Sequence, residues 1–126
     1  RQRQMCIRDS NTLMEIKNKY RDLPVYITEN GHGMYEEADE NGYVVDDARI
    51  EMMQGYIDFM FKAMEDGCDV RGYYAWSSMD LYSWVNGYEK RYGLVRVDFD
   101  NDNKRIPKKS YYWFKNLIEK YQKENS

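Results

Sequence analysis

Residues 23–31 have the sequence Leu-Pro-Val-Tyr-Ile-Thr-Glu-Asn-Gly, and this stretch decides the fold. The apolar run from Leu23 to Ile27 predicts a buried β-strand, and the Asn-Gly pair that follows predicts a turn. Glu29 is therefore expected at the end of a strand, where a sheet presents one carboxylate beyond its edge. The alternative is that Glu29 merely closes the strand and faces solvent.

The segments around this strand predict an alternation of helices and strands. Apolar residues recur at intervals of three and four over residues 11–20 and again over 47–66, which predicts one helix before the strand and a longer one after it. Gly67 is placed to end the longer helix, and residues 68–75 form the next predicted strand. Residues 30–46 are expected to be a long solvated loop that carries the carboxylates Glu36, Glu37, Asp39 and Glu40. Strand, loop, helix and strand in this order predict a parallel α/β unit.

The longer helix has an apolar face that we expect to lie in the core. Its members are Ile50, Met53, Ile57, Met60, Phe61 and Met64. A methionine-rich face can also form a peptide-binding groove, but between two strands core packing is the expected role. Further on, residues 94–99 and the turn Asn101-Asp102-Asn103 predict a hairpin-like return. A last helix is expected from about residue 108 to 122, with a buried side made of Phe114, Leu117, Ile118 and Tyr121.

Three blocks of the sequence resemble the C-terminal part of glycoside hydrolase family 1, the family of β-glucosidases and 6-phospho-β-glycosidases. They are Tyr26-Ile27-Thr28-Glu29-Asn30-Gly31, Gly72-Tyr73-Tyr74-Ala75-Trp76-Ser77-Ser78-Met79-Asp80 and Gly87-Tyr88-Glu89-Lys90-Arg91-Tyr92-Gly93-Leu94-Val95-Arg96-Val97-Asp98. The resemblance runs from about Leu13 to Tyr121 and implies an α/β fold, the C-terminal part of a (β/α)₈ barrel at about its seventh and eighth βα units. Such a barrel needs about 250 residues, whereas the chain has 126. A truncated barrel is therefore expected.

The first ten residues, Arg-Gln-Arg-Gln-Met-Cys-Ile-Arg-Asp-Ser, have no counterpart in the family and no amphipathic period. We expect residues 1–10 to be a non-native leader translated from adapter or vector sequence, and residues 11–126 to be the C-terminal portion of the family 1 barrel. An authentic flexible terminus is the alternative.

The resemblance implies a retaining β-glycosidase in which Glu29 is the catalytic nucleophile. Retaining enzymes use two carboxyl groups about 5–5.5 Å apart, a nucleophile and an acid/base. The family's acid/base glutamate lies in an Asn-Glu-Pro motif that this sequence lacks, and Asp80 and Glu89 lie in patterns that the family uses to shape the site. The fragment alone is therefore expected to be inactive, and the missing N-terminal part of the same barrel is its implied partner.

Substrate choice is expected to depend on residues 83–92. Family members that act on unmodified glucosides usually have Glu-Trp where this sequence has Ser83-Trp84. A serine removes a charge that would repel a phosphate, and Ser83, Lys90 and Tyr92 resemble the phosphate-binding trio of the 6-phospho-β-glycosidases. The alternative is that this stretch is a structural loop.

Two tryptophans are expected to shape the sugar site. Trp76 matches the family tryptophan that stacks on the sugar at the cleavage point, with a plain core tryptophan as the alternative. Trp84 is similar to the residue of the 6-phospho-β-galactosidase branch, since the 6-phospho-β-glucosidases commonly lack an indole there.

The function implied is hydrolysis of 6-phospho-β-galactosides, with 6-phospho-β-glucosides as further substrates. The enzyme alternative is a β-glucosidase or β-galactosidase for unphosphorylated sugars, and the alternative of another class is a non-catalytic carbohydrate-binding or interaction module. The implied partner is a small phosphodisaccharide or β-glycoside, and neither a metal nor an organic cofactor is implied. Because phosphorylated disaccharides arise by phosphotransferase uptake, the resemblance implies the cytoplasm of a bacterium.

Composition argues against other classes of function. A net charge of −3 and a pI near 5.2 disfavour nucleic-acid and anionic-membrane partners, and the basic cluster Lys104, Arg105, Lys108 and Lys109 is expected to be a solvated loop. The single histidine, His32, excludes a Ser-His-Asp triad or a multi-histidine metal site within this chain. No run approaches the roughly 20 apolar residues of a membrane helix.

Overall fold

A computed structural model of the chain describes residues 12–20, 23–124 and 126. The described residues divide into two compact units, the first formed by those up to Asn30 together with Glu51–Ala75 and the second by those of Gly31–Ile50 together with Trp76–Ser126. Residues 1–10, for which we expected a non-native leader, lie outside the described residues. Among the described residues, neither long helix combines the length and the apolar character that crossing a membrane requires.

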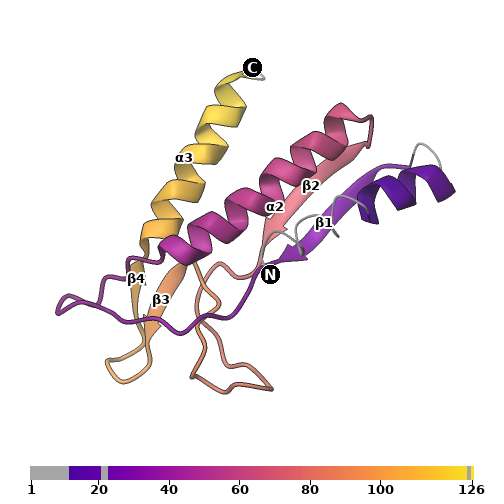
Figure 1. The fold of residues 1–126 in the computed structure, drawn as a ribbon. Coiled ribbons are helices and arrows are strands. Elements are labelled where there is room, and N and C mark those ends of the chain that lie inside the picture. Colours follow the sequence, from indigo (N-terminus) through magenta and orange to yellow (C-terminus); the bar gives the residue numbers. More distant parts are fainter. Residues whose placement is uncertain (1–11, 21–22, 125) are drawn as a thin grey trace. The chain divides into compact units, whose positions relative to one another are not determined.

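The first unit contains a parallel strand–helix–strand arrangement, as the sequence predicts. Residues 12–20 are helical and precede strand β1, Val25–Asn30, which pairs in parallel with β2, Val70–Ala75. The pairing runs from Val25 opposite Val70 to Asn30 opposite Ala75. Helix α2, Asp47–Glu65, connects the two strands (Figure 1). Both strands therefore end at the same edge of the sheet.

The C-terminus of α2 has the capping geometry that Gly67 predicts. Gly67 has φ +92°, a left-handed conformation that glycine adopts without a steric penalty. Its N–H donates to the carbonyl of Met64 at 2.9 Å, and the N–H of Cys68 donates to that of Ala63 at 2.9 Å. This Schellman pattern satisfies the last carbonyls of the helix and directs the chain into β2.

The core of the first unit confirms the packing role of the helix face. Buried Leu13, Ala63, Cys68 and Val70 form a cluster against which Met14, Val25, Ile27, Met60 and Met64 pack. Met53 and Ile57 are also buried. The expectation that β1 is a buried strand is wrong, because its residues alternate between half-buried and exposed and Glu29 is exposed. The physical reason is that β1 pairs along one edge only in the described part of the chain.

The second unit contains the predicted hairpin and the last helix. Strand β3, Val95–Asp98, pairs antiparallel with β4, Lys104–Pro107, and the connecting turn places Asp102 and Asn103 at positive φ. Asp and Asn tolerate this conformation better than other non-glycine residues, which is why the sequence predicts the turn. Helix α3, Lys109–Glu124, follows directly (Figure 1).

Two expectations about the second unit are wrong. On α3, Ile118 and Tyr121 are 42% and 44% exposed instead of buried, because the helix is covered by its own unit mainly at its first turn, where Ser110 is fully buried. The loop of residues 30–46 is not simply solvated, because Val44 and Asp46 are buried within it.

Candidate active site

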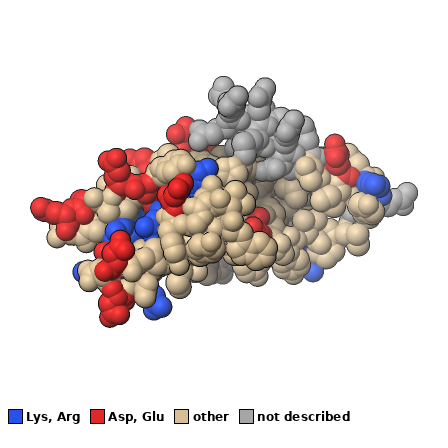
Figure 2. Space-filling model, turned by 90° about the horizontal axis from the view of Figure 1, so that it is seen from below, with Lys and Arg blue, Asp and Glu red and all other residues tan. Residues whose placement is uncertain are grey.

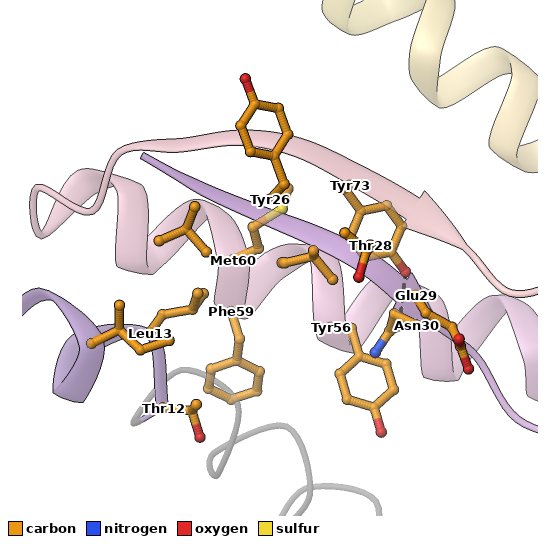
Figure 3. Close-up of a pocket in the computed structure, with 13 residues that line it drawn as sticks. Thr12, Leu13, Tyr26, Thr28, Glu29, Asn30, Tyr56, Phe59, Met60 and Tyr73 are labelled. Atoms are coloured by element: carbon orange, nitrogen blue, oxygen red, sulfur yellow. Dashed lines mark hydrogen bonds between the residues drawn. The ribbon is translucent and has the colours of Figure 1, made fainter. Parts of the chain in front are cut away.

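Glu29 lies at the polar end of a pocket in the first unit. The pocket has a volume of about 340 Å³. At one end Glu29 and Asn30 of β1 lie near Tyr73 of β2 and Tyr56 of α2, and at the other end the lining is apolar, with Leu13, Phe59 and Met60 (Figure 3). The carboxylate is thus presented at the end of a strand beside hydrogen-bonding groups, while apolar side chains hold the elements behind it.

A hydrogen bond between the two strands fixes the side chain next to Glu29. The Tyr73 hydroxyl donates to Oδ1 of Asn30 at 2.8 Å (Figure 3). Burial raises the pKa of the Tyr73 phenol, and nearby Tyr56 adds to the rise. Tyr73 therefore stays a neutral donor at any working pH and holds the Asn30 amide in one orientation.

We expect Tyr73→Phe to lower the free energy of unfolding of this protein by about 1 kcal/mol near neutral pH, since one hydrogen bond is lost. Because the folded-state pKa of Tyr73 is raised, its stabilisation is complete below the ordinary value of about 10 and is lost as the pH rises toward the folded-state pKa. The difference between wild type and variant should therefore shrink above about pH 10. Urea unfolding from pH 8 to 11 measures it, and a constant difference would contradict the assignment.

In the second unit, the turn from Ser83 to Gly87 brings together two of the three predicted phosphate-binding residues. The N–H of Ser83 donates to the carbonyl of Gly87 at 2.9 Å, and the N–H of Gly87 donates back at 2.8 Å. The Ser83 hydroxyl lies 3.4 Å from that of Tyr92. Asn86 donates from Nδ2 to the same Tyr92 oxygen at 2.9 Å. Sequence reasoning missed Asn86, although an Asn-Gly pair inside the turn was a usable signal.

The positive charge of Lys90 acts on the Tyr92 phenol. Hydrogen bonding by Ser83 lowers the pKa of the Tyr92 phenol, and Asn86 and the positive charge of Lys90 lower it further. The Lys90 ammonium itself lies over the ring of Tyr35, 5.4 Å from its centre. Two of the three predicted residues, Ser83 and Tyr92, thus lie together, and a role of Lys90 beside them stays a prediction.

The ring of Tyr92 is held in place by its backbone surroundings. A Cβ added to Gly33 would lie 2.4 Å from Cζ of Tyr92, so the loop backbone touches the ring and only glycine fits. The carbonyl of Tyr92 accepts a hydrogen bond from Arg49 at 3.1 Å. The phenol oxygen therefore has a fixed position relative to the Ser83 turn.

Both predicted sugar-binding tryptophans are accessible. Trp84 lies in the Ser83–Gly87 turn and is 96% exposed, whereas Trp76, directly after β2, is 41% exposed. Trp76 is therefore not a core side chain of its unit. Glu29 belongs to the first unit and the five other predicted site residues belong to the second.

Sequence reasoning missed a buried ion network that supports this segment. Lys108 and Glu36 were expected in solvated loops, but their side chains are 0% and 5% exposed and form an ion pair. Lys108 also binds Asp80 at 2.9 Å, and Asp80 accepts a hydrogen bond from the N–H of Gly93 at 2.9 Å. The expectation was wrong because the pairing joins residues 72 positions apart, which no local pattern predicts.

Arg49, at the start of α2, extends this network to the predicted phosphate-binding segment. Its guanidinium binds Glu36 and Asp46 and donates to the carbonyls of His32, Arg91 and Tyr92 at 3.0, 2.9 and 3.1 Å. Asp46 in turn accepts hydrogen bonds from the hydroxyl and N–H of Ser110. The buried Arg49 side chain thus links the loop after β1 to the backbone carbonyls of Arg91 and Tyr92.

We expect Lys108→Met to lower the free energy of unfolding by about 3–5 kcal/mol, because Glu36 and Asp80 would keep buried charges without their shared partner. The neighbouring Lys109 offers a matched control, since its pair with Asp47 is 47% and 65% exposed. Lys109→Met should cost far less, because an ion pair on the exposed surface contributes little to stability. Urea unfolding of both variants measures the difference, and equal costs would refute a structural role for the network.

On the face shown in Figure 2, Lys and Arg side chains are mixed with Asp and Glu and form no continuous basic surface among the described residues. This distribution agrees with the acidic composition of the chain.

The first unit presents a carboxylate at the end of a parallel strand, where β/α-barrel enzymes place their catalytic residues. The second unit separately presents two exposed indoles and a pair of neighbouring hydroxyls. The model of glycosyl hydrolase family 1 matches residues 3–123. The chain belongs to this family.

Curated relatives and solved structures agree with the family. The chain is 49% identical over 108 residues to a 6-phospho-β-galactosidase of Streptococcus mutans, covering 85% of this chain and 23% of the relative. It is 48% identical over 109 residues to the 6-phospho-β-galactosidase of Leptotrichia buccalis, covering 83% and 23%. A family 1 β-glucosidase from Thermotoga maritima in complex with isofagomine lactam matches with a TM-score of 0.83 and 38% identity, covering 88% of this chain and 25% of that one. The chain thus spans about a quarter of the length of these proteins.

Proposed function

We propose that residues 11–126 are the C-terminal portion of a retaining β-glycosidase that hydrolyses 6-phospho-β-galactosides. The portion would supply about the seventh and eighth βα units of a (β/α)₈ barrel. The observation that carries the substrate proposal is the convergence of the Ser83 and Tyr92 hydroxyls, 3.4 Å apart. The positive charge of Lys90 also acts on the Tyr92 phenol and lowers its pKa. Relatives at 47% to 49% identity that are named 6-phospho-β-galactosidases support the same substrate class.

In the proposed reaction, a carboxylate oxygen of Glu29 attacks the anomeric carbon and forms a covalent glycosyl-enzyme, while the aglycone oxygen leaves with a proton from a general acid. Water, deprotonated by the same group, then releases the sugar with retained configuration. The described residues supply Glu29 for this chemistry, and we assign the acid/base to the part of the barrel that these relatives have and this chain lacks. This chain alone is therefore expected to be inactive.

The remaining site residues divide the recognition of the sugar between them. Trp76 would stack on the pyranose ring, and Trp84 would line the side that distinguishes galactose from glucose. Ser83, Lys90 and Tyr92 would bind the 6-phosphate by charge-assisted hydrogen bonds, which are about twice as strong as neutral ones. Such substrates are phosphorylated during uptake by bacteria, so we also infer action in the bacterial cytoplasm.

The alternative function is hydrolysis of unphosphorylated β-glucosides. It is favoured by the similarity to the Thermotoga maritima β-glucosidase at 38% identity. The higher identity to the 6-phospho-β-galactosidases and the serine at position 83 favour the phosphorylated substrate.

The proposal is tested with the complete enzyme that carries this segment. The values of kcat/KM are compared for nitrophenyl β-galactoside 6-phosphate and for nitrophenyl β-galactoside. The same comparison is made for nitrophenyl β-glucoside 6-phosphate and nitrophenyl β-glucoside. We expect a preference for the 6-phosphate of about 100-fold or more, equivalent to at least 2.7 kcal/mol of transition-state stabilisation. Equal values, or a preference for the plain sugar, would overturn the phosphate assignment and leave the family unaffected.

A further inference from the structure

Asn86 and the turn around it determine which atoms of the two hydroxyls remain available. A hydroxyl has one proton to donate and two lone pairs that accept. The Ser83 oxygen accepts from the N–H groups of Val85 and Asn86, both at 3.3 Å. The Tyr92 oxygen accepts from Nδ2 of Asn86 at 2.9 Å. Both lone pairs of Ser83 and one lone pair of Tyr92 are thus directed toward N–H donors that belong to the turn.

The consequence is that both hydroxyls can act as donors toward a ligand. The two oxygens lie 3.4 Å apart and can share one proton between them at most, in a long and weak bond. At least one O–H is therefore free to donate. An anion that has only acceptors can take both protons, whereas a neutral sugar hydroxyl must donate as well as accept to make full use of its contacts.

We propose that Asn86 is a positioning residue that makes the pair of Ser83 and Tyr92 selective for a phosphate dianion. This inference rests on the proposed function and adds a specificity determinant to its site. By donating to the Tyr92 oxygen, the Asn86 amide orients the phenol so that its proton is directed to the ligand. By donating to Ser83, the backbone of the same turn does the same for the serine.

The surroundings of Asn86 favour this role over a purely structural one. Asn86 is half-buried, and its amide bonds to the functional oxygen of Tyr92, whereas the adjacent Val85 is 89% exposed. The hydrogen bond also helps to lower the pKa of the Tyr92 phenol. A more acidic phenol is a stronger donor to an anion.

Two substitutions in the complete enzyme separate positioning from folding. Asn86→Ala removes the donor, and Asn86→Asp replaces it by a carboxylate of the same shape that would accept the Tyr92 proton and repel a dianion. We expect the ratio of kcat/KM for the 6-phosphogalactoside to that for the plain galactoside to fall about tenfold in Asn86→Ala and further in Asn86→Asp. The control Val85→Ala should keep the wild-type ratio. A loss of folding would lower both values of kcat/KM together and leave the ratio unchanged.

A second readout does not depend on the phosphate proposal. The pKa of Tyr92, followed by NMR of ¹³C-labelled tyrosine in the complete enzyme, should rise toward its ordinary value in Asn86→Ala. If wild type prefers the phosphate and Asn86→Ala keeps that ratio within twofold while its kcat/KM for the plain galactoside stays near wild type, the inference is wrong while the proposed function stands. If wild type shows no preference, the proposed function fails. An unchanged Tyr92 pKa in Asn86→Ala would refute the hydrogen bond itself.

Discussion

Glu29→Ala in the complete enzyme is expected to lower kcat for a 6-phospho-β-galactoside by roughly 10⁴-fold or more, because the covalent step loses its nucleophile. The side chain is exposed at the end of β1, so its removal should hardly change the free energy of unfolding. A thermal unfolding curve checks this second expectation. The exposed Glu37, in the loop after β1, provides a matched control, since Glu37→Ala should keep nearly full activity.

The loss in Glu29→Ala also has a diagnostic chemical rescue. A small anion such as azide fits the space left by the carboxylate and can attack the anomeric carbon from the same side. The aglycone leaves with its proton as before, and the product is a glycosyl azide of inverted configuration. Restored turnover with this product supports Glu29 as nucleophile. Residual activity above a few per cent of wild type, or rescue that gives no azide product, would contradict the assignment.

Ser83→Glu is expected to abolish the preference for phosphorylated substrate. The Ser83 hydroxyl lies 3.4 Å from that of Tyr92, so a glutamate here would bring a carboxylate close to the phenol, where it would repel the phosphate and accept the phenol proton. Juxtaposed like charges cost several kcal/mol, so the ratio of kcat/KM for the phosphorylated and plain galactosides should fall by roughly 100-fold to 1,000-fold. Ser83→Ala removes only one hydroxyl and should lower the ratio by about tenfold.

A second glutamate substitution controls for added charge alone. Ser78 is exposed and lies in the same unit as Ser83. Ser78→Glu introduces the same charge on another segment of the unit and should leave the ratio near its wild-type value. If Ser83→Glu behaves like Ser78→Glu, the phosphate site is misplaced.

The elements that the sequence predicts correctly are those with local physical signals. The α2 face repeats with the period of a helix, Gly67 supplies the left-handed cap, and Asn101-Asp102-Asn103 supplies the hairpin turn. Each of these signals depends on neighbours within a few residues. They therefore survive in the folded chain.

The errors concern partners that are distant in the sequence. The pairing of Lys108 with Glu36 and Asp80 joins three separate segments, and a charge pattern alone cannot distinguish it from a solvated loop. Likewise, the apolar pattern of α3 indicates which face of the helix favours burial. It does not indicate whether another segment covers Ile118 and Tyr121, which are exposed. A helical period indicates a preference of one face, whereas burial depends on the whole fold.

For the candidate site, too, the sequence pointed to individual residues but not to the contacts that depend on the folded chain. The resemblance pointed to Ser83, Lys90 and Tyr92, and of these Ser83 and Tyr92 lie together in the folded chain. It did not indicate that Asn86 donates to the Tyr92 oxygen, because that contact depends on the conformation of the Ser83–Gly87 turn. Nor did it indicate that Arg49, from the start of α2, binds the backbone at Arg91 and Tyr92.

Covalent trapping tests the central claim most directly, because it examines the nucleophile and the phosphate preference together. The complete enzyme is incubated with 2-deoxy-2-fluoro-β-galactosyl fluoride and, separately, with its 6-phosphate. Fluorine at C2 slows both the formation and the hydrolysis of the covalent glycosyl-enzyme. Because fluoride is a good leaving group, the glycosyl-enzyme still forms and then accumulates. Peptide mass spectrometry should find the sugar phosphate on Glu29, formed much faster than the adduct of the unphosphorylated analogue. A label on any other residue, or equal labelling rates for the two reagents, would contradict the account.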